Sequence, residues 1–244
     1  MNENKNVAVV IMAAGKGTRM RTDLPKVLTP MKGRPLLSYV LKAARGINPA
    51  LIAVIVGHKR DMVTDRFKAD DIAFVTQEPQ LGTGHAVAQA EQVLADFDGD
   101  IVTLSGDVPL IKKETIEKLI SAHRGADAVL TVLTCDLDDP ASYGRITRAG
   151  GKIAGNVEAK DATADQLNVK EINCGIYVFK SSFLFPALKQ VNNNNAQGEY
   201  YLTDLINMAV ADGHTVCGVK TEDRAEALGV NTAKDLEALE DGVK

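Results

Sequence analysis

The sequence has few cysteines and no long apolar run, and these absences exclude several classes of protein. The cysteines are Cys135, Cys174 and Cys217, which are far apart and show no CxxC spacing. A disulfide framework or a zinc site is therefore not expected, and a reducing cytoplasm is the expected location. No apolar segment approaches the roughly 20 residues of a membrane-spanning helix. The polar residues 1–6 lack the layout of a signal peptide.

The chain also lacks an excess of positive charge. Its formal net charge is -4, so no global field attracts nucleic acid. The basic residues are nevertheless concentrated between positions 15 and 60, where Asp23 is the only acid. This local pattern fits a small anionic ligand better than a nucleic-acid surface, so no nucleic-acid partner is expected. The lack of a long apolar run leads us to expect no membrane partner. For Lys32, Lys42 and Arg45, a solvated basic face remains an alternative.

The composition is that of a globular protein, with 45% hydrophobic and 25% charged residues among 244. Apolar runs rich in β-branched residues alternate with helical patterns, which predicts a Rossmann-like, doubly wound α/β fold with a mixed, mostly parallel sheet. Predicted strands cover residues 7–12, 51–56, 72–75, 100–105, 127–134, 172–179 and 215–219. Predicted helices cover residues 34–46, 60–68, 86–97, 113–124, 181–191, 200–212 and 232–239, and a shorter one covers 223–229.

The sequence pattern changes after the strand predicted over 127–134. A small β hairpin with a glycine turn is predicted over residues 143–148 and 152–157. We expect residues 1–231 to form one domain, in which about 140–180 form an inserted β-rich lobe. Residues 232–244 would add a C-terminal helix, capped by Thr232. Ser181 or Ser182 is expected to cap its own helix.

The first strand runs into a glycine-rich basic loop. Gly15 and Gly17 allow a sharp turn whose amides can converge on phosphate oxygens. The loop lacks the spacing of a Walker A motif, and Met20 stands where the dinucleotide fingerprint needs a third glycine. Residues 24–60 contain no acid for a ribose, so an oxidoreductase is disfavoured.

Several polar residues follow predicted strands or turns. Asp107 suits a hard divalent cation such as Mg²⁺, with a helix or turn cap as the alternative. Asn231 also precedes a helix, where asparagine is common. Glu158 and Asn173 flank the lobe and suit sugar hydroxyls, with structural roles as the alternative. His123 is expected at the surface.

The sequence shows no obvious general base. A phosphate monoester is already an anionic nucleophile near neutral pH, so its attack on a nucleotide phosphorus needs positioning and charge neutralisation instead.

These motifs resemble the sugar-1-phosphate nucleotidylyltransferases. Four blocks carry the resemblance: Ala13–Met20 with Leu24–Lys26, Gln80–Ala86, Glu171–Tyr177 and Gln197–Asp204. Together they are similar to the uridylyltransferase domain of bacterial N-acetylglucosamine-1-phosphate uridylyltransferases, over about residues 7–231. The resemblance implies Mg²⁺-dependent transfer of UMP from UTP to N-acetylglucosamine 1-phosphate. Alternatives are uridylyl or thymidylyl transfer to glucose 1-phosphate, or a non-catalytic sugar-nucleotide sensor.

The resemblance also implies residue roles. Arg19 and Lys26 would be catalytic and would contact the phosphates. Asp107 and Asn231 would bind Mg²⁺. The nucleotide would contact Met12, Ala13, Ala14, Gly15, Lys26, Gln77, Gly82 and Thr83. The sugar phosphate would contact Gly106, Gly144, Glu158, Asn173, Tyr201 and Thr203.

Two departures from the family pattern qualify these expectations. Ser105 stands where many members carry tyrosine, which puts any contact of that ring in doubt. No hexapeptide repeat follows, so we expect no β-helical acetyltransferase domain in this chain, and we do not carry over the trimer that depends largely on that domain. A monomer or weak dimer is the expectation.

Overall fold

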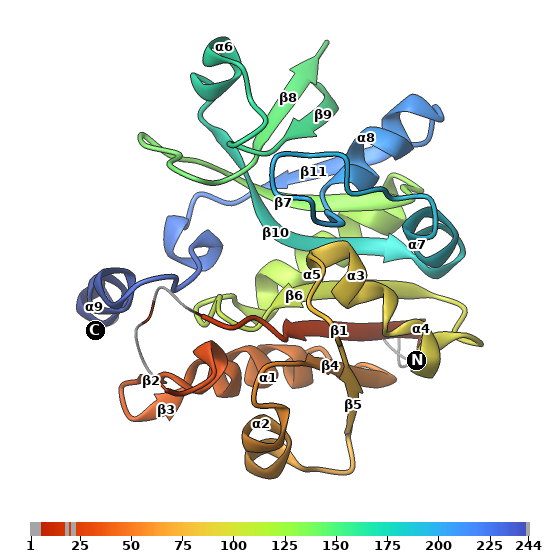
Figure 1. Cartoon of the computed structure of the whole chain (residues 1–244). Helices are drawn as coiled ribbons and strands as arrows, with labels where there is room; N and C mark the ends of the chain where they lie inside the picture. The colour runs from red at the N-terminus through yellow and green to blue at the C-terminus, as the bar shows by residue number, and fades with distance from the viewer. Residues whose placement is uncertain (1–5, 18–19, 21–22, 243–244) are drawn as a thin grey trace.

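A computed structural model describes residues 6–17, 20 and 23–242 of the chain. These residues form a nine-stranded sheet with helices on both faces, and a separate two-stranded ribbon of β2 and β3 (Figure 1). The strands of the large sheet are β1 Val7–Ala13, β4 Leu51–Val56, β5 Ile72–Thr76, β6 Asp100–Ser105, β7 Leu130–Asp136, β8 Arg145–Ala149, β9 Lys152–Val157, β10 Glu171–Lys180 and β11 Val216–Lys220. The ribbon is formed by β2 Pro30–Met31 and β3 Arg34–Pro35.

The main path of the sheet runs β11-β7-β10-β6-β1-β4-β5. β1 pairs in parallel with β4 and β6, β4 with β5, and β7 with β11, whereas β10 is antiparallel to both of its neighbours on this path. The predicted mixed, mostly parallel sheet is confirmed. Because β1, β5 and β6 run in one direction, the turns that follow them meet at one edge of the sheet.

The helices are α1 Leu36–Gly46, α2 Arg60–Phe67, α3 Thr83–Ala88, α4 Glu91–Leu94, α5 Lys113–Gly125, α6 Ala164–Leu167, α7 Ser181–Leu188, α8 Asp204–Ala211 and α9 Ala233–Gly242. Short 3-10 turns occupy Lys26–Leu28 and Arg224–Ala227.

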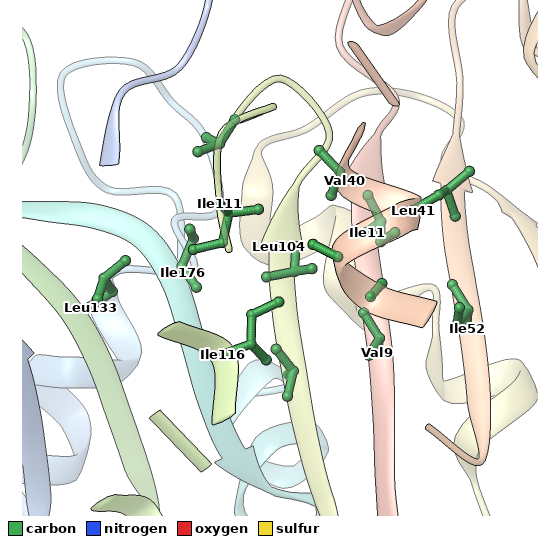
Figure 2. Close-up of a cluster of buried hydrophobic side chains, with 14 of the residues drawn as sticks. Val9, Ile11, Val40, Leu41, Ile52, Leu104, Ile111, Ile116, Leu133 and Ile176 are labelled. Carbon is green, nitrogen blue, oxygen red and sulfur yellow. The ribbon is translucent and has the colours of Figure 1, made fainter. Parts of the chain in front are cut away.

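Alternate residues of β1 face two separate cores, as expected for a strand buried on both sides. Val9 and Ile11 pack with α1, α2 and α5, whereas Ala8 and Val10 pack with α3, α4, α7 and α8. Figure 2 shows the first of these cores, in which Val40 of α1 points toward β1. This packing fixes β1 rigidly, and with it the start of the glycine loop.

The hairpin of β8 and β9 stands with α6 at one end of the molecule (Figure 1). Gly150 and Gly151 connect its strands with φ angles of 57° and 81°, a backbone that favours glycine. β8 also pairs with β10 through Ile172 and Arg145, so the predicted hairpin is joined to the main sheet.

Several predicted helices have different bounds: the helix expected over 34–46 begins at Leu36, the one over 181–191 ends at Leu188, and the one over 223–229 is the 3-10 turn Arg224–Ala227. Two further differences have a clear local cause. The helix expected over 86–97 begins at Thr83 and is interrupted after Ala88. There the Gln89 side chain donates to the His85 carbonyl, while the Gln89 amide bonds the Ala86 carbonyl instead. The helix expected over 200–212 begins at Asp204, because the Tyr200 amide donates to the Leu81 carbonyl and the Tyr200 carbonyl accepts from the Gly84 amide of α3.

The strand predicted from Asp127 begins at Leu130. Asp127 itself takes a φ of 46° in the turn that follows α5, which delays the extended backbone.

Two predicted side-chain environments were wrong. Ser181 does not cap α7 through its side chain; its Oγ accepts a hydrogen bond from the Gly99 amide. His123 is 1% exposed, and its Nδ1 lies 2.9 Å from Thr131 Oγ1. By contrast, the Thr232 hydroxyl accepts from the Asp235 amide at the start of α9, as predicted. Within the described residues, no helix combines the length and apolarity needed to span a bilayer.

Candidate functional site

A cleft of about 500 Å³ lies at the edge of the sheet where β1, β5 and β6 end. The predicted nucleotide-binding residues Met12, Ala13, Ala14, Gly15, Lys26, Gln77, Gly82 and Thr83 all line it, together with Lys16, Gly17, Val27, Gln80, Ala86, Ser105, Asp107 and Glu199. Two loops separated by about 60 residues of sequence therefore converge on one volume, which is of the size that small-molecule sites typically have.

Backbone hydrogen bonds hold the start of the glycine loop. The Gly106 amide donates to the Met12 carbonyl over 2.9 Å, and the His58 amide donates to the Ala14 carbonyl over 3.4 Å. Gly17 has a φ of 61°, and a Cβ placed there would lie 2.6 Å from the Lys26 Cβ. The absence of a side chain at Gly17 thus lets the loop pack directly against Lys26.

The second loop is organised by Gln77, which is 3% exposed. Its Nε2 lies 2.9 Å from the Gly82 carbonyl oxygen and 3.1 Å from His85 Nδ1. Gly82 has a φ of 113°, and a Cβ there would lie 2.6 Å from the Tyr200 carbonyl oxygen. The Thr83 hydroxyl accepts from the Leu202 amide over 3.0 Å. This loop is therefore fixed against the segment that precedes α8.

Lys26 lies at the centre of the polar end of the cleft. Its Nζ donates to the Asp107 carboxylate and, over 2.8 Å, to the Asn231 carbonyl oxygen Oδ1. The Lys26 and Asp107 side chains are only 13% and 22% exposed. The structure thus brings together three predicted functional residues that are up to 205 positions apart.

Asn231 is held in this arrangement by its neighbours. The Val230 amide donates to the Asp107 carbonyl over 2.9 Å. The Asn231 Nδ2 donates to the Gly229 carbonyl, which orients its Oδ1 toward Lys26. The Asp235 carboxylate accepts from the amides of Asn231 and Thr232 at the start of α9. The first turn of α9 therefore positions Asn231.

The donor set of Asp107 and Asn231 fits a hard divalent cation. One carboxylate oxygen and one amide oxygen bond the same ammonium, so both point to one cationic position. Such oxygen ligands suit Mg²⁺, which usually completes its shell with water and substrate phosphates. The described residues contain no group of three or more His, Cys, Asp or Glu side chains arranged for a metal.

The predicted sugar-binding residues Gly144, Glu158 and Asn173 lie together at the base of the hairpin. The Asn173 amide donates to the Gly144 carbonyl over 2.9 Å. A Cβ at Gly144 would lie 3.0 Å from Glu158 Oε1 and 2.8 Å from Asn156 Oδ1. Asn173 is buried, and its Oδ1 accepts from both the Gly175 amide and the Tyr177 hydroxyl.

Tyr201 and Thr203 lie on the segment that leads into α8. The Tyr201 hydroxyl accepts from Gln197, and the Thr203 hydroxyl is buried without a partner among the described residues. Asp204 follows at the start of α8. Burial, followed by the charges of Glu158 and Asp161, raises the pKa of Asp204 to about 6.

Three observations complete the placement of the predicted residues. Arg19 lies outside the described residues. Gly106 lies between the Met12 carbonyl and the Val27 side chain, where a Cβ would approach each within 3.0 Å; its predicted sugar contact stays a prediction. Sequence reasoning gave no role to Glu199 or to Asn156, although Glu199 falls within a motif that carried the family resemblance.

A family model described as the MobA-like NTP transferase domain matches residues 9–205. The bifunctional protein GlmU of Pelobacter propionicus is 46% identical over 95% of this chain and 51% of its own length. GlmU of Pseudomonas putida is 48% identical over 95% of this chain and 50% of its own length. The chain thus spans about half the length of the curated relatives it matches.

The solved structure of a UDP-glucose pyrophosphorylase complexed with UDP-glucose superposes with a TM-score of 0.79 at 15% identity, covering 96% of this chain and 97% of the other. This likeness agrees with the α/β sheet described above. Because the family model covers most of the chain, from within β1 to the first turn of α8, the protein belongs to the family of MobA-like NTP transferase domains.

Proposed function

We propose that the protein transfers UMP from UTP to N-acetylglucosamine 1-phosphate, which yields UDP-N-acetylglucosamine and pyrophosphate, with Mg²⁺ as the cofactor. The observation that carries the proposal is the convergence of the glycine loop, the Gln77–Thr83 loop and the pair Lys26–Asp107 on one cleft. The similarity to GlmU proteins over 95% of the chain supports the choice of this reaction within the family.

The reaction needs no proton abstraction by the protein. An oxygen of the sugar phosphate attacks the α-phosphorus of UTP, a new P–O bond forms, and the bond from that phosphorus to the β-phosphate bridging oxygen breaks. Pyrophosphate leaves with the electron pair of the broken bond. Phosphoryl chemistry of this kind depends on positioning and on neutralisation of negative charge.

The residues of the cleft supply those two requirements. The glycine loop offers backbone amides and close approach to the triphosphate. Lys26 supplies a positive charge beside the phosphates, where nearby positive charge stabilises the transition state. Asp107 and Asn231 would hold Mg²⁺, which when bound would neutralise further phosphate charge.

The acceptor would bind at Gly144, Glu158 and Thr203, which are not among the residues that line the cleft itself. Glu158 is a hydrogen-bond acceptor there, and sugar hydroxyls are donors that match it. The link between the two substrate regions is the segment around Tyr200 to Leu202, whose backbone bonds the loop before α3. Both substrates would therefore be bound within one rigid frame.

The proposal is tested by measuring pyrophosphate release across a matrix of nucleoside triphosphates and sugar 1-phosphates with Mg²⁺. The expected result is preferential turnover with UTP and N-acetylglucosamine 1-phosphate. A preference for dTTP or for glucose 1-phosphate would overturn the assigned substrates. Absence of turnover with every pair, together with retained binding of UDP-N-acetylglucosamine, would identify a sugar-nucleotide sensor instead.

A further inference from the structure

A chain of side-chain hydrogen bonds runs from the core of the sheet to Glu158. The Tyr177 hydroxyl donates to Asn173 Oδ1 over 2.9 Å. Asn173 Nδ2 donates to Asn156 Oδ1 over 3.1 Å, and Asn156 Nδ2 donates to Glu158 Oε1 over 3.4 Å. Each group thus donates to the next, and the last acceptor is the Glu158 carboxyl group. We call Tyr177, Asn173, Asn156 and Glu158 the amide relay.

The direction of the amide relay is fixed by the backbone. The Gly175 amide can only donate, and it donates to Asn173 Oδ1 over 2.9 Å. The Asn173 oxygen must therefore face Gly175, and its Nδ2 must face Asn156. The acceptor of that bond is Asn156 Oδ1, which leaves Asn156 Nδ2 to face Glu158. Rotation of either amide by 180° would place two like groups against each other.

Asn156 is also held from outside the relay. Asn207 of α8 accepts from the Asn156 backbone amide over 2.8 Å and donates to the Asn156 carbonyl over 2.9 Å. Its side chain thereby pairs with β9 as a neighbouring strand would. Gly155 leaves room for this contact, since a Cβ there would lie 2.8 Å from Asn207 Oδ1. The relay is therefore attached to both β9 and α8.

The relay residues are buried, unlike the carboxylate at its end. Tyr177, Asn173 and Asn156 are 1%, 5% and 7% exposed. Buried polar groups that satisfy each other specify a single arrangement, because any alternative leaves a donor or acceptor unpaired. Polar side chains add no hydrophobic stabilisation to the core. We therefore take the function of this arrangement to be the orientation of the Glu158 carboxylate.

We propose that Asn156 and Tyr177 are positioning residues that hold Glu158 as a hydrogen-bond acceptor for the sugar phosphate, and that Asn207 locks Asn156 in place. This inference rests on the proposed function. The group that Glu158 recognises is a donor on the acceptor substrate, either a sugar hydroxyl or the N–H of an acylamino group. The hydrogen bonds of the relay given above join none of its residues to the glycine loop or to the Gln77–Thr83 loop, so we expect its effect to be confined to the sugar side of the site.

The test compares Asn156→Leu, which removes both relay bonds, with Tyr177→Phe, which removes only the first donor. Thr103→Val serves as the control, because Thr103 pairs with Tyr177 across the sheet and its buried hydroxyl has no partner among the described residues. The steady-state constants for both substrates and the affinity for UDP-N-acetylglucosamine by calorimetry are measured for all proteins.

We expect Asn156→Leu to raise KM for N-acetylglucosamine 1-phosphate and Kd for the product about tenfold, and Tyr177→Phe to raise both about threefold. KM for UTP should stay within about twofold in both variants and all constants should be unchanged in the control. Equal changes for the two substrates, or unchanged sugar constants in both variants, would overturn the inference. If the unaltered protein binds the product without turnover, the proposed function fails while calorimetry still decides the role of the relay; if it does neither, both fail.

Discussion

Lys26 and Asp107 form an ion pair across 81 positions of sequence, inside the cleft where the turns after β1 and β6 meet. The pair joins the Lys26 ammonium, next to the glycine loop, to the Asp107 carboxylate, which follows β6. The same ammonium also bonds Asn231, which the first turn of α9 positions. These contacts make one polar centre from three distant segments, and the first two predictions concern it.

Replacing Asp107 with asparagine should lower kcat about 100-fold or more, because the variant loses the negative charge that would hold Mg²⁺. The fold should persist, since asparagine can still accept from Lys26. A shift in Tm below about 4 °C is expected. Asp223→Asn is the matched control, because Asp223 also pairs with a lysine, Lys112, but outside the cleft. Equal loss of activity in both variants, or unfolding of Asp107→Asn, would indicate a structural role for Asp107.

Removing the ammonium should strengthen metal binding in the substrate-free protein. A divalent cation that uses Asp107 and Asn231 must displace the Lys26 ammonium and bind beside its charge. Lys26→Met should therefore lower the Kd for Mn²⁺, measured by electron paramagnetic resonance, at least about tenfold, while turnover falls. Weaker Mn²⁺ binding in this variant would show that the metal does not use this position.

The loop before α3 should not tolerate a side chain at Gly82. With a φ of 113° and the Tyr200 backbone oxygen 2.6 Å from the Cβ position, alanine would displace Gln77 or Tyr200. We expect Gly82→Ala to raise KM for UTP about tenfold. Gly213→Ala separates strain from displacement, because Gly213 also has a positive φ, of 74°, but nothing lies within 4 Å of its Cβ position. KM for UTP should be unchanged in that variant.

The sequence predicted the parts of the fold that local pattern determines. The β-branched run that forms β1 and the turns after β1, β5 and β6 were identified from their residues and lie where expected. The interrupted helix at Gln89 was missed because a side-chain hydrogen bond to the His85 carbonyl replaces the regular helical bond. Whether the Gln89 side chain takes the place of the backbone amide depends on its rotamer, and the periodicity of apolar residues does not reveal that rotamer.

Only part of the candidate site could be predicted from the sequence. Asp107 was identified because it follows a predicted strand, and Glu158 because it flanks the predicted lobe; the family resemblance then implied their roles. Asn156 and Asn207 carry no motif, and their roles arise from the packing of α8 against β9. His123 was expected at the surface, yet it is buried against Thr131 of β7. Contacts between distant segments were thus the information that the sequence did not contain.

Stability should depend on pH through Asp204. Burial, followed by repulsion from Glu158 and Asp161, raises the pKa of Asp204 from 3.8 to about 6 in the folded protein. The folded state therefore binds this proton more tightly than the unfolded state, and the associated stability is fully present below pH 3.8 and is lost as pH rises through about 6. Asp204→Asn should raise Tm at pH 7.5 and have little effect at pH 4. An equal effect at both pH values would contradict this assignment.

The most direct test of the account is the fate of labelled phosphates in a single reaction with UTP, N-acetylglucosamine 1-phosphate and Mg²⁺. The account predicts that label from the α-phosphate of UTP enters the sugar nucleotide and that label from the γ-phosphate enters pyrophosphate. Release of the α-label as free UMP, or of the γ-label as inorganic phosphate, would contradict nucleotidyl transfer in the cleft formed by Lys26 and Asp107.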